Sequence, residues 1–478
     1  MITFTICLLL LIGGYFTYGK FVERMMKPTN DPTPVVLHPD GVDYIPMPVW
    51  KLYMIQFLNI AGLGPIFGAI MGAQFGTASF VWIVVGTIFA GATHDYMAGI
   101  LSLRNNGESL PETIGRYLGL TAKQVMRVFT VVLLILVGAV FVSGPAELLA
   151  GMTPNSLNAT FWIIVIFIYY ILATLLPIDK IIGKIYPLFA AALIFMAIGI
   201  LFMLYWHHPP IPELSHGFSE NLKQQPIFPM MFVSIACGAI SGFHATQSPL
   251  MARCMTHEKQ GRRIFYGAMV TEGIVALIWA AAAVYFYDAN GGITNPETGG
   301  PFTGAFVATK ISEGWLGTFG GLLALLGIVA APISTGDTAL RSARLMVADF
   351  FKVEQRSMSK RLLISIPIFL ITVGILLFSI RDKAGFDIIW RYFAWSNQAL
   401  SVFTLWALTV YLTRKEKPYL VTLIPALFMT AVCVTYICYA PEGLGMSLML
   451  SYCTGGACVL VSVVWYIIWR KRFNIKSK

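Results

Sequence analysis

Side chains that can bind or carry a cation lie inside long apolar stretches of this 478-residue sequence. His94 and Asp95 are neighbours within residues 79–103, and an adjacent imidazole and carboxylate can titrate near neutral pH and relay protons. The same two residues also fit a fixed structural ion pair with a basic residue of a neighbouring loop. From the sequence alone, both interpretations stay open.

A second group of oxygen-bearing side chains lies toward the end of the apolar stretch 315–338. The neighbouring hydroxyls of Ser334 and Thr335 suit sodium, which prefers oxygen ligands, if they face backbone carbonyls of an unwound helix. Asp337 can carry a proton, or it can pair with Arg341 four residues later on the same helical face. The sequence thus predicts a coupling ion, proton or sodium, and neither a cofactor nor a bound metal other than that possible sodium.

A third group of polar residues interrupts the apolar stretch 227–252. Ser241, Gly242, His244 and Gln247 are candidates for a solute-binding site, because polar groups inside a membrane face a cavity or partner helices. The hydroxyls in this group fit hydrogen bonds between helices equally well. Asn397 and Gln398, within residues 391–412, fit either a gate or contacts between helices.

The segment that would position these groups is 52–75, whose middle reads Ala61-Gly62-Leu63-Gly64-Pro65. Glycine and proline weaken a helix there, and proline is favoured at the first position of a new helix. We therefore predict two half-helices joined by a short unwound link, with Pro65 at the start of the second. Unwound backbone at membrane depth survives only around protein or a water-filled cavity, so the link predicts a binding site. A kink with a packing role is the alternative.

A second break is expected in 227–252, at Gly238, Gly242 and Pro249, and Pro332 with Gly336 should disturb a third helix. The first two segments lie five spans apart and would therefore cross the membrane in opposite directions. Two broken helices in oppositely oriented halves are typical of secondary transporters with inverted repeats. The residues expected to bind the solute at the first break are Gly62, Gly64, Pro65 and Gln74. The coupling ion, proton or sodium, would lie between Ala61 and the hydroxyls of Ser334 and Thr335, or on Asp337, His94 and Asp95.

The composition identifies the class of protein. The chain is 57% hydrophobic and only 12% charged, against about 25% charged in soluble domains, and its mean hydropathy is +0.73. Most of the 33 Lys and Arg residues fall in alternate loops, so the net charge of +10 reflects a basic inner face of a membrane protein rather than nucleic-acid binding. The seven cysteines lie in apolar segments, and we expect neither a disulfide nor a metal site from them.

The expected fold is an all-α polytopic membrane protein with about thirteen transmembrane helices, each of about 20 residues. The expected spans are 2–19, 52–75, 79–103, 127–149, 159–177, 185–206, 227–252, 264–287, 315–338, 362–380, 391–412, 419–440 and 446–469. We divide the chain into an N-terminal span and loop (1–51), a five-helix repeat (52–206), an inverted five-helix repeat (227–412), and two further spans with a basic tail (413–478). The N-terminus would lie outside the cell and the C-terminus inside.

Several stretches resemble the carbon starvation protein A (CstA) family of bacterial inner-membrane transporters. They are DGVDYIPMPVWKLYMIQFLNIAGLGPIFGAIMGAQFG (41–76), GATHDYMAGILSLRNNGESLPETIGRYLG (91–119), ACGAISGFHATQSPLMARCM (236–255), APISTGDTALRSARLMVADF (331–350) and RYFAWSNQALSVFTLW (391–406). The resemblance implies uptake of peptides or pyruvate in carbon starvation, and an architecture of the leucine-transporter type. By position, the family's Gly-Pro break falls on Gly64-Pro65, its His-Asp pair on His94-Asp95, and its Ser-Thr-Gly-Asp run on residues 334–337. The chain is shorter than the longer family members.

We therefore predict a secondary active transporter, not an enzyme, that imports small carbon nutrients across the bacterial cytoplasmic membrane, coupled to a proton or sodium gradient. Its expected partners are a small solute, peptide or pyruvate, and membrane lipid, with no nucleic acid; the sequence does not give an oligomeric state. The alternatives are a passive channel, which would show no coupling to a second ion, and a nutrient-sensing membrane receptor, which would usually carry a soluble domain.

Overall fold

The computed structural model describes residues 1–175, 182–296, 299–355, 357–381 and 385–476, and these ranges are helical with connecting loops. Within them there is no strand, only one isolated bridge between Thr294 and Pro301. The all-α class is thus confirmed. The helices of the first half are α1 (Ile2–Phe16), α2 (Tyr18–Met26), α3 (Pro34–Leu37), α4 (Val49–Ile60), η1 (Gly64–Gly68), α5 (Ala69–Ala73), α6 (Ala78–Val85), η2 (Gly86–Gly91), α7 (Ala92–Arg104), α8 (Leu110–Leu118), α9 (Leu120–Met152), α10 (Ala159–Leu175) and α11 (Ile182–His207).

The second half adds helices that run from Leu214 to Lys476. They are η3 (Leu214–His216), α12 (Ile227–Ser234), α13 (His244–Ala252), η4 (Glu258–Gln260), η5 (Arg262–Tyr266), α14 (Gly267–Ala289), α15 (Gly304–Phe351), α16 (Met358–Arg381), α17 (Gly385–Arg414), α18 (Leu420–Tyr439) and α19 (Leu448–Lys476). Eight helical stretches in the described residues are long and apolar enough to cross a membrane, or nine with one bent pair.

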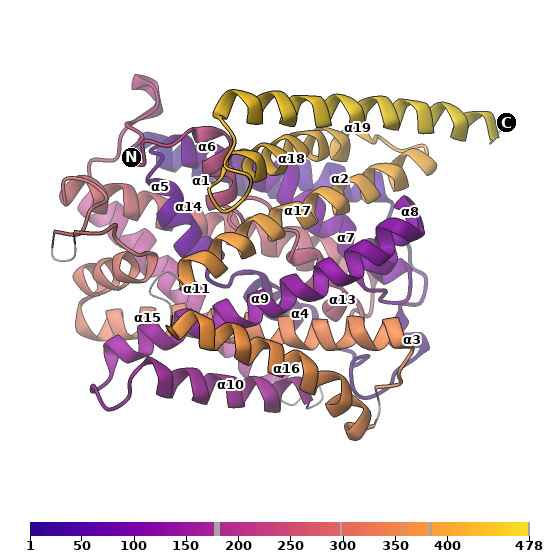
Figure 1. Cartoon of the computed structure of the whole chain (residues 1–478), viewed down its shortest axis with the longest axis horizontal. Coiled ribbons are helices and arrows are strands. Elements are labelled where there is room, and N and C mark those ends of the chain that lie inside the picture. Colours follow the sequence, from indigo (N-terminus) through magenta and orange to yellow (C-terminus); the bar gives the residue numbers. More distant parts are fainter. Residues whose placement is uncertain (176–181, 297–298, 356, 382–384, 477–478) are drawn as a thin grey trace.

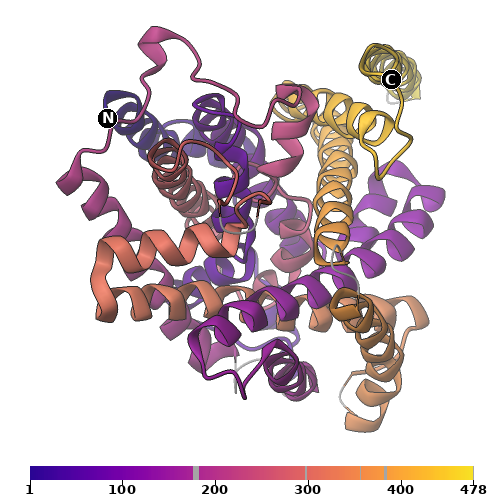
Figure 2. The ribbon, with the colours of Figure 1, turned by 60° about the vertical axis from the view of Figure 1, so that its left-hand side comes forward.

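The helices form one bundle whose long axis is horizontal in Figure 1. The chain termini lie at opposite ends of this axis, with α10 and α16 along one edge and α19 along the other. The last helix, α19, packs on α18 and lies at the margin of the bundle in both views (Figures 1 and 2). The broken segments described next lie within the bundle, between α14, α15 and α17.

The first predicted break is confirmed. Helix α4 ends at Ile60, and η1 begins at Gly64 with Pro65 in its first turn, so that the two parts meet at an angle of 55°. The link residue Ala61 has φ −80° and ψ 53°, outside the helical region. The second part starts as a π-helical turn, a geometry that often occurs at functional sites. Proline thus begins the second half-helix, as its missing N–H and fixed φ favour.

The second predicted break is also present. Helix α12 ends at Ser234 and α13 begins at His244, with non-helical backbone between them that holds both Gly238 and Gly242. Pro249 does not contribute to this break, because it lies inside α13. The two glycines rather than the proline mark the unwound stretch.

The two breaks run antiparallel and pack against each other. A Cβ built on Gly64 lies 2.2 Å from Cβ of Cys237, and one on Gly72 lies 2.1 Å from the side chain of Ile235. At the other end of the pair, Met47 N donates a hydrogen bond to Cys254 O over 3.2 Å. Rising residue numbers in the first segment therefore meet falling numbers in the second, which is the relationship expected of two oppositely oriented halves.

The third expected disturbance, at Pro332 and Gly336, is wrong. Helix α15 continues through both residues, and its backbone departs from helical geometry only at Gly317, where φ is 64°. The hydroxyls of Ser334 and Thr335 bond to Ala331 O, and Tyr170 donates to Pro332 O, so side-chain hydroxyls bond to the backbone next to the proline. Gly336 is needed for packing, because a Cβ there would lie 2.2 Å from the Tyr170 hydroxyl.

Candidate functional site

Four buried ionisable side chains connect three helices beside the second break. His94 Nδ1 lies 2.8 Å from Asp95 Oδ1, and Asp95 Oδ2 lies 2.8 Å from His244 Nδ1. The other ring nitrogen of His244, Nε2, lies 3.4 Å from Glu272 Oε2. All four side chains have no exposed surface. We call this group the His-Asp-His-Glu chain.

Each member comes from an element that packs tightly on the break. His94 and Asp95 lie in the first turn of α7, directly after the π-helical stretch η2, where Gly91 lets the backbone approach Ala239 O. His244 is the first residue of α13, immediately after the unwound link. Glu272 lies on α14 next to Gly273, which packs against Thr87, and the Thr87 hydroxyl donates to Gly238 O over 3.1 Å. The chain is therefore fixed at the depth of the break.

The two ends of the chain retain unused hydrogen-bonding capacity. Both carboxylate oxygens of Glu272 and Nε2 of His94 make no hydrogen bond in the described part of the protein. Buried polar groups in proteins nearly always have partners, and exceptions call for an explanation such as a functional role or a bound species. In the middle of the chain, Asp95 is instead paired on both oxygens, and its partners are two histidines rather than a basic loop residue.

The second break is tied to α17 by two carboxamides. Asn397 Oδ1 accepts hydrogen bonds from Ser241 Oγ (2.9 Å) and Phe243 N (2.7 Å), and Asn397 O accepts from Gly242 N (3.1 Å). Gln398 Nε2 donates to Phe232 O over 3.1 Å. Both amides thus link helices in this conformation. Ser241 and Gly242 therefore face α17 in this conformation.

The residues expected at the first break are buried and closely packed. A Cβ on Gly62 would lie 2.7 Å from the Phe141 ring and 3.1 Å from Thr335 Oγ1, while Gly64 contacts Cys237. Just before the break, Gln56 and Asn59 are fully buried, and their amide atoms make no hydrogen bond among the described residues. Gln74 lies away from the break, at the end of α5, where Nε2 donates to the Tyr287 hydroxyl over 3.2 Å. The second-break residue Gln247 donates to Thr246 Oγ1, and its Oε1 has no partner in the described part of the chain.

The expected ion site on α15 is in contact with the first broken segment. The Thr335 hydroxyl lies within hydrogen-bonding distance of Leu58 O of α4 (3.0 Å) and of Ala331 O in its own helix (2.9 Å), and its single O–H is shared between these two carbonyls. Ser334 Oγ donates to Ala331 O over 2.7 Å. The Asp337 carboxylate accepts a hydrogen bond from the Tyr186 hydroxyl, and its other oxygen has no hydrogen-bond partner within the described ranges. Arg341 Nη1 lies 3.7 Å from Asp43 Oδ1.

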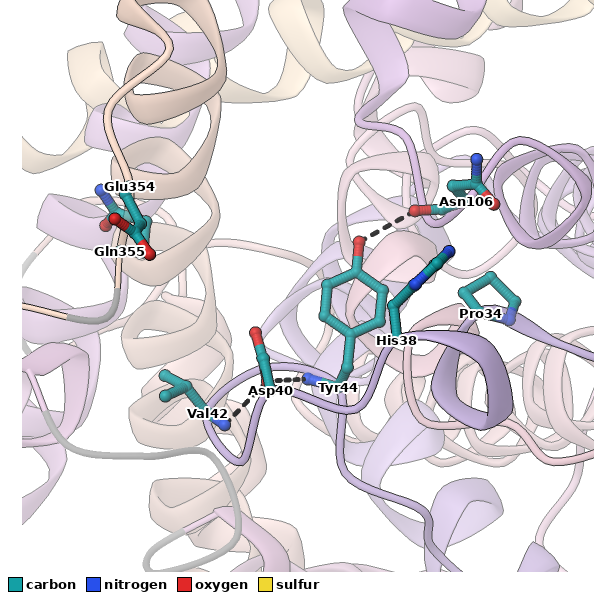
Figure 3. A pocket seen from close by; sticks show the side chains of 8 residues that line it. All are labelled: Pro34, His38, Asp40, Val42, Tyr44, Asn106, Glu354 and Gln355. Carbon is teal, nitrogen blue, oxygen red and sulfur yellow. Dashed lines mark hydrogen bonds between the residues drawn. The ribbon is translucent and has the colours of Figure 1, made fainter.

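Both breaks are sealed from the surface, since Ala61, Gly62, Gly64, Pro65 and residues 241–248 are all buried. Among the residues that the structure describes, no group of three His, Cys, Asp or Glu side chains could hold a metal ion. An open cavity of about 360 Å³ lies elsewhere. It is lined by the segment before α4, by Asn106 after α7 and by the residues that follow α15 (Figure 3). There Tyr44 Oη donates to Asn106 O over 2.8 Å, and Asp40 Oδ1 accepts from the backbone N–H of Val42 and Tyr44. None of its lining residues belongs to either break.

Two features of the site are not predicted from the sequence. Glu272 is a lone carboxylate within the apolar run 264–287, and an intramembrane ionisable residue is by default a candidate functional residue. That signal could have found it. The pairing of His244 with Asp95 had no such signal, because the two residues lie 149 positions apart in the sequence and on different helices.

Comparisons with known proteins agree with this architecture. The family model described as carbon starvation protein CstA matches residues 1–156, 146–303 and 302–436. An uncharacterized membrane protein of Haemophilus influenzae is 43% identical over 60% of this chain and 92% of its own length. The peptide transporter CstA of Bacillus subtilis is 26% identical over 95% of this chain and 93% of its own. The pyruvate/proton symporter BtsT of Escherichia coli is 28% identical over 56% of this chain, and the match spans 47% of the symporter.

Two solved structures show the same fold at low sequence identity. A manganese transporter of Eremococcus coleocola has a TM-score of 0.58 at 13% identity, over 91% of this chain and 99% of its own. A Na⁺-coupled sialic acid symporter in its outward-open state has a TM-score of 0.54 at 13% identity, over 95% of this chain and 96% of its own. Both are membrane transporters. At 13% identity the likeness shows the fold alone and does not identify the solute of this chain.

Proposed function

The chain belongs to the carbon starvation protein CstA family, and on this premise we propose that it is a secondary active transporter that imports a small carbon nutrient. One observation carries the proposal: two broken helices run antiparallel and meet at their unwound links, where Gly64 contacts Cys237. This arrangement is the one in which transporters hold a solute and its coupling ion near the middle of the membrane.

The solute would bind where the two links meet. Gly62, Gly64 and Pro65 present backbone at the first link, and Gln247 and His244 follow the second. Gln56 and Asn59 would supply hydrogen bonds to the solute, because their amide atoms are buried and have no partners in the described structure. Relatives that carry peptides or pyruvate make these two classes the solutes to test first.

Binding requires the closed contacts to separate. The N–H groups of Gly242 and Phe243 at the start of α13 already bond to Asn397, so they can meet a solute carboxylate only after α13 moves from α17. Likewise, Gly64 and Cys237 leave no space between the links. The closed form would thus be one stage of an alternating-access cycle, in which each side opens in turn.

The coupling ion would be a proton or sodium, with two candidate positions. His94 and Asp95 lie in the buried chain beside the second break, and Ser334, Thr335 and Asp337 lie on α15 beside the first, near Ala61. The E. coli relative is a proton symporter and one structural neighbour is Na⁺-coupled, so relatives support ion coupling without selecting the ion.

The proposed topology has thirteen spans and an inverted pair of five-helix units at 52–206 and 227–412. Its basic face lies on the cytoplasmic side of the bacterial inner membrane. The antiparallel pairing of the two breaks supports the inversion. Fusion of a fluorescent protein to the C-terminus tests the orientation, because the fusion should fluoresce only when the C-terminus is inside.

Uptake by purified protein in proteoliposomes tests the function. Labelled pyruvate and labelled dipeptides are offered under an imposed pH gradient, an imposed sodium gradient, or neither. We expect one solute class to accumulate above its external concentration under one gradient. Equilibration that ignores both gradients would indicate a passive channel, and no uptake of either class would contradict the proposal.

A further inference from the structure

The His-Asp-His-Glu chain connects two unbroken helices through one residue of a broken helix. Asp95 on α7 and Glu272 on α14 flank His244, which is the first residue after the unwound link. A change in the angle of α13 would therefore alter both contacts of His244 at once. Of the four residues in the His-Asp-His-Glu chain, His244 alone belongs to a broken helix, since His94 and Asp95 lie on α7 and Glu272 lies on α14.

The two contacts of His244 differ in length. The contact to Asp95 is a hydrogen bond of 2.8 Å, whereas Nε2 and Glu272 Oε2 are 3.4 Å apart and form no hydrogen bond. The group is therefore hydrogen-bonded between Asp95 and His244 but not between His244 and Glu272. A carboxylate buried in an apolar surrounding without a partner is costly when ionised. Of the four groups, Glu272 is therefore the one for which binding a proton removes the largest cost of burying a charge.

The electrostatic surroundings are set by few groups. The nearest ionisable group to the Glu272 carboxylate is His244, whose Nε2 lies 3.4 Å away, and Asp95 lies on the other side of the same ring. Cys237 lies in the second link, in contact with Gly64. Helix α4, which packs on α13 and α14, carries the amides Gln56 and Asn59, and its Tyr53 hydroxyl lies 2.6 Å from the hydroxyl of Thr271 on α14. Glu272 therefore lies next to His244, the first residue after the second break.

We propose that Glu272 binds the transported proton and that His244 exchanges it with Asp95 when the broken helix moves. In one direction, the Glu272 O–H bond breaks and a bond to His244 Nε2 forms, while the His244 Nδ1–H bond breaks and one to Asp95 Oδ2 forms. One proton enters the imidazole and one leaves it, so the ring keeps its charge. His94, bonded to the other oxygen of Asp95, is a positioning residue. This inference rests on the proposed transport function and selects the proton over sodium.

The experiment uses E272Q, which keeps the size and hydrogen-bonding character of the side chain but cannot carry a proton. Full-length protein in proteoliposomes is assayed in two modes, with the solute that the wild type accumulates. The first is exchange of labelled for unlabelled solute at equal pH on both sides. The second is accumulation under an inward proton gradient, together with solute-induced alkalinisation of the external medium, read with a pH-sensitive dye.

We expect E272Q to retain exchange within about twofold while accumulation and alkalinisation fall at least tenfold. The matched control is E213Q, a carboxylate in the loop after α11 that accepts hydrogen bonds from the backbone N–H of Ile2 and Thr3. It should behave as the wild type in both modes. Proton-driven accumulation by E272Q at the wild-type level would overturn the inference.

The remaining outcomes separate this inference from the transport function. Wild-type accumulation driven by sodium and insensitive to pH would refute the proton site but would still support the proposed transport function. Absence of any wild-type exchange or uptake would refute the transporter itself, and the proton site with it. If E272Q fails to fold, H244N decides, because asparagine cannot pass a proton between the two carboxylates. Proton-driven accumulation by folded H244N at the wild-type level would then refute the relay.

Discussion

Gly64 and Cys237 occupy the point at which the two broken helices meet. A Cβ on Gly64 would lie 2.2 Å from Cβ and 2.5 Å from Sγ of Cys237, closer than atoms of two residues can approach. The first link therefore needs a glycine for packing as well as for its backbone. Gly64 thus both interrupts the helix and leaves the space that the Cys237 side chain occupies.

The substitution G64A should lower the melting temperature of the purified protein and reduce uptake at least tenfold. Overpacking a well-packed core costs about 1–3 kcal/mol. The second-site change C237G removes the colliding atoms, so G64A/C237G should recover most of the lost stability. The control is G374A, at an exposed helical glycine with nothing within 4 Å of a built Cβ. A G64A protein that melts and transports like the wild type would show that the two links do not touch.

The substitution G242A should be more damaging than G64A, and no side-chain change should rescue it. A Cβ there would lie 2.3 Å from Ser401 N and 2.5 Å from Asn397 O, which are backbone atoms of α17 that cannot turn aside. We expect loss of uptake and a larger drop in melting temperature than for G64A. Equal effects of the two variants would indicate that α17 yields easily at this point.

The breaks were predictable from the sequence because their causes are local. Two glycines and a proline within Ala61–Pro65 disfavour a helix whatever surrounds them. Pro332 shows the limit of that reasoning. Its helix continues through the proline, where Tyr170 from α10 bonds to Pro332 O and packs against Gly336. Contacts of this kind between helices cannot be read from one segment.

The ionisable chain was predictable only in part for the same reason. His94 and Asp95 are adjacent in sequence, so their pairing was visible. His244 and Glu272 join them through the packing of α7, α13 and α14, and periodicity within one helix does not give such contacts. Asn397 was likewise ambiguous until its bonds to Ser241 and Phe243 showed a link between helices.

Removing the Asn397 amide should destabilise the second break more than removing one of its donors. N397A leaves both the Ser241 hydroxyl and the Phe243 N–H without their acceptor, at a cost of about 1–3 kcal/mol for each buried group left unpaired. S241A loses only one of the two bonds and should lie between N397A and the wild type. Melting curves of the purified proteins check the order, and a smaller effect for N397A than for S241A would contradict it.

Acid should weaken the contact between α8 and α9 through Glu112. Burial acts to raise the pKa of Glu112, but hydrogen bonds from Lys123 and Arg127 outweigh it and hold the pKa below the ordinary value of 4.5. Folding thus favours the ionised form, so this contribution to stability is complete above pH 4.5 and is lost as the pH falls through the lowered pKa. E112Q should melt lower than the wild type at pH 7 and approach it at acidic pH. A constant difference between the two proteins over this range would contradict the assignment.

Substitutions of Thr335 test the other candidate coupling ion, sodium bound between α15 and α4. The Thr335 hydroxyl donates to Leu58 O and so ties α15 to the first broken segment without any ion. T335V keeps the shape of the side chain and leaves this buried carbonyl without its donor, so we expect a stability loss of about 1 kcal/mol, which T335S should largely avoid. If Glu272 carries the coupling ion, wild-type uptake should not depend on sodium, and T335V should slow proton-driven uptake without changing its gradient requirement. Uptake that sodium stimulates in the wild type and in T335S but not in T335V would instead place sodium between Thr335 and α4.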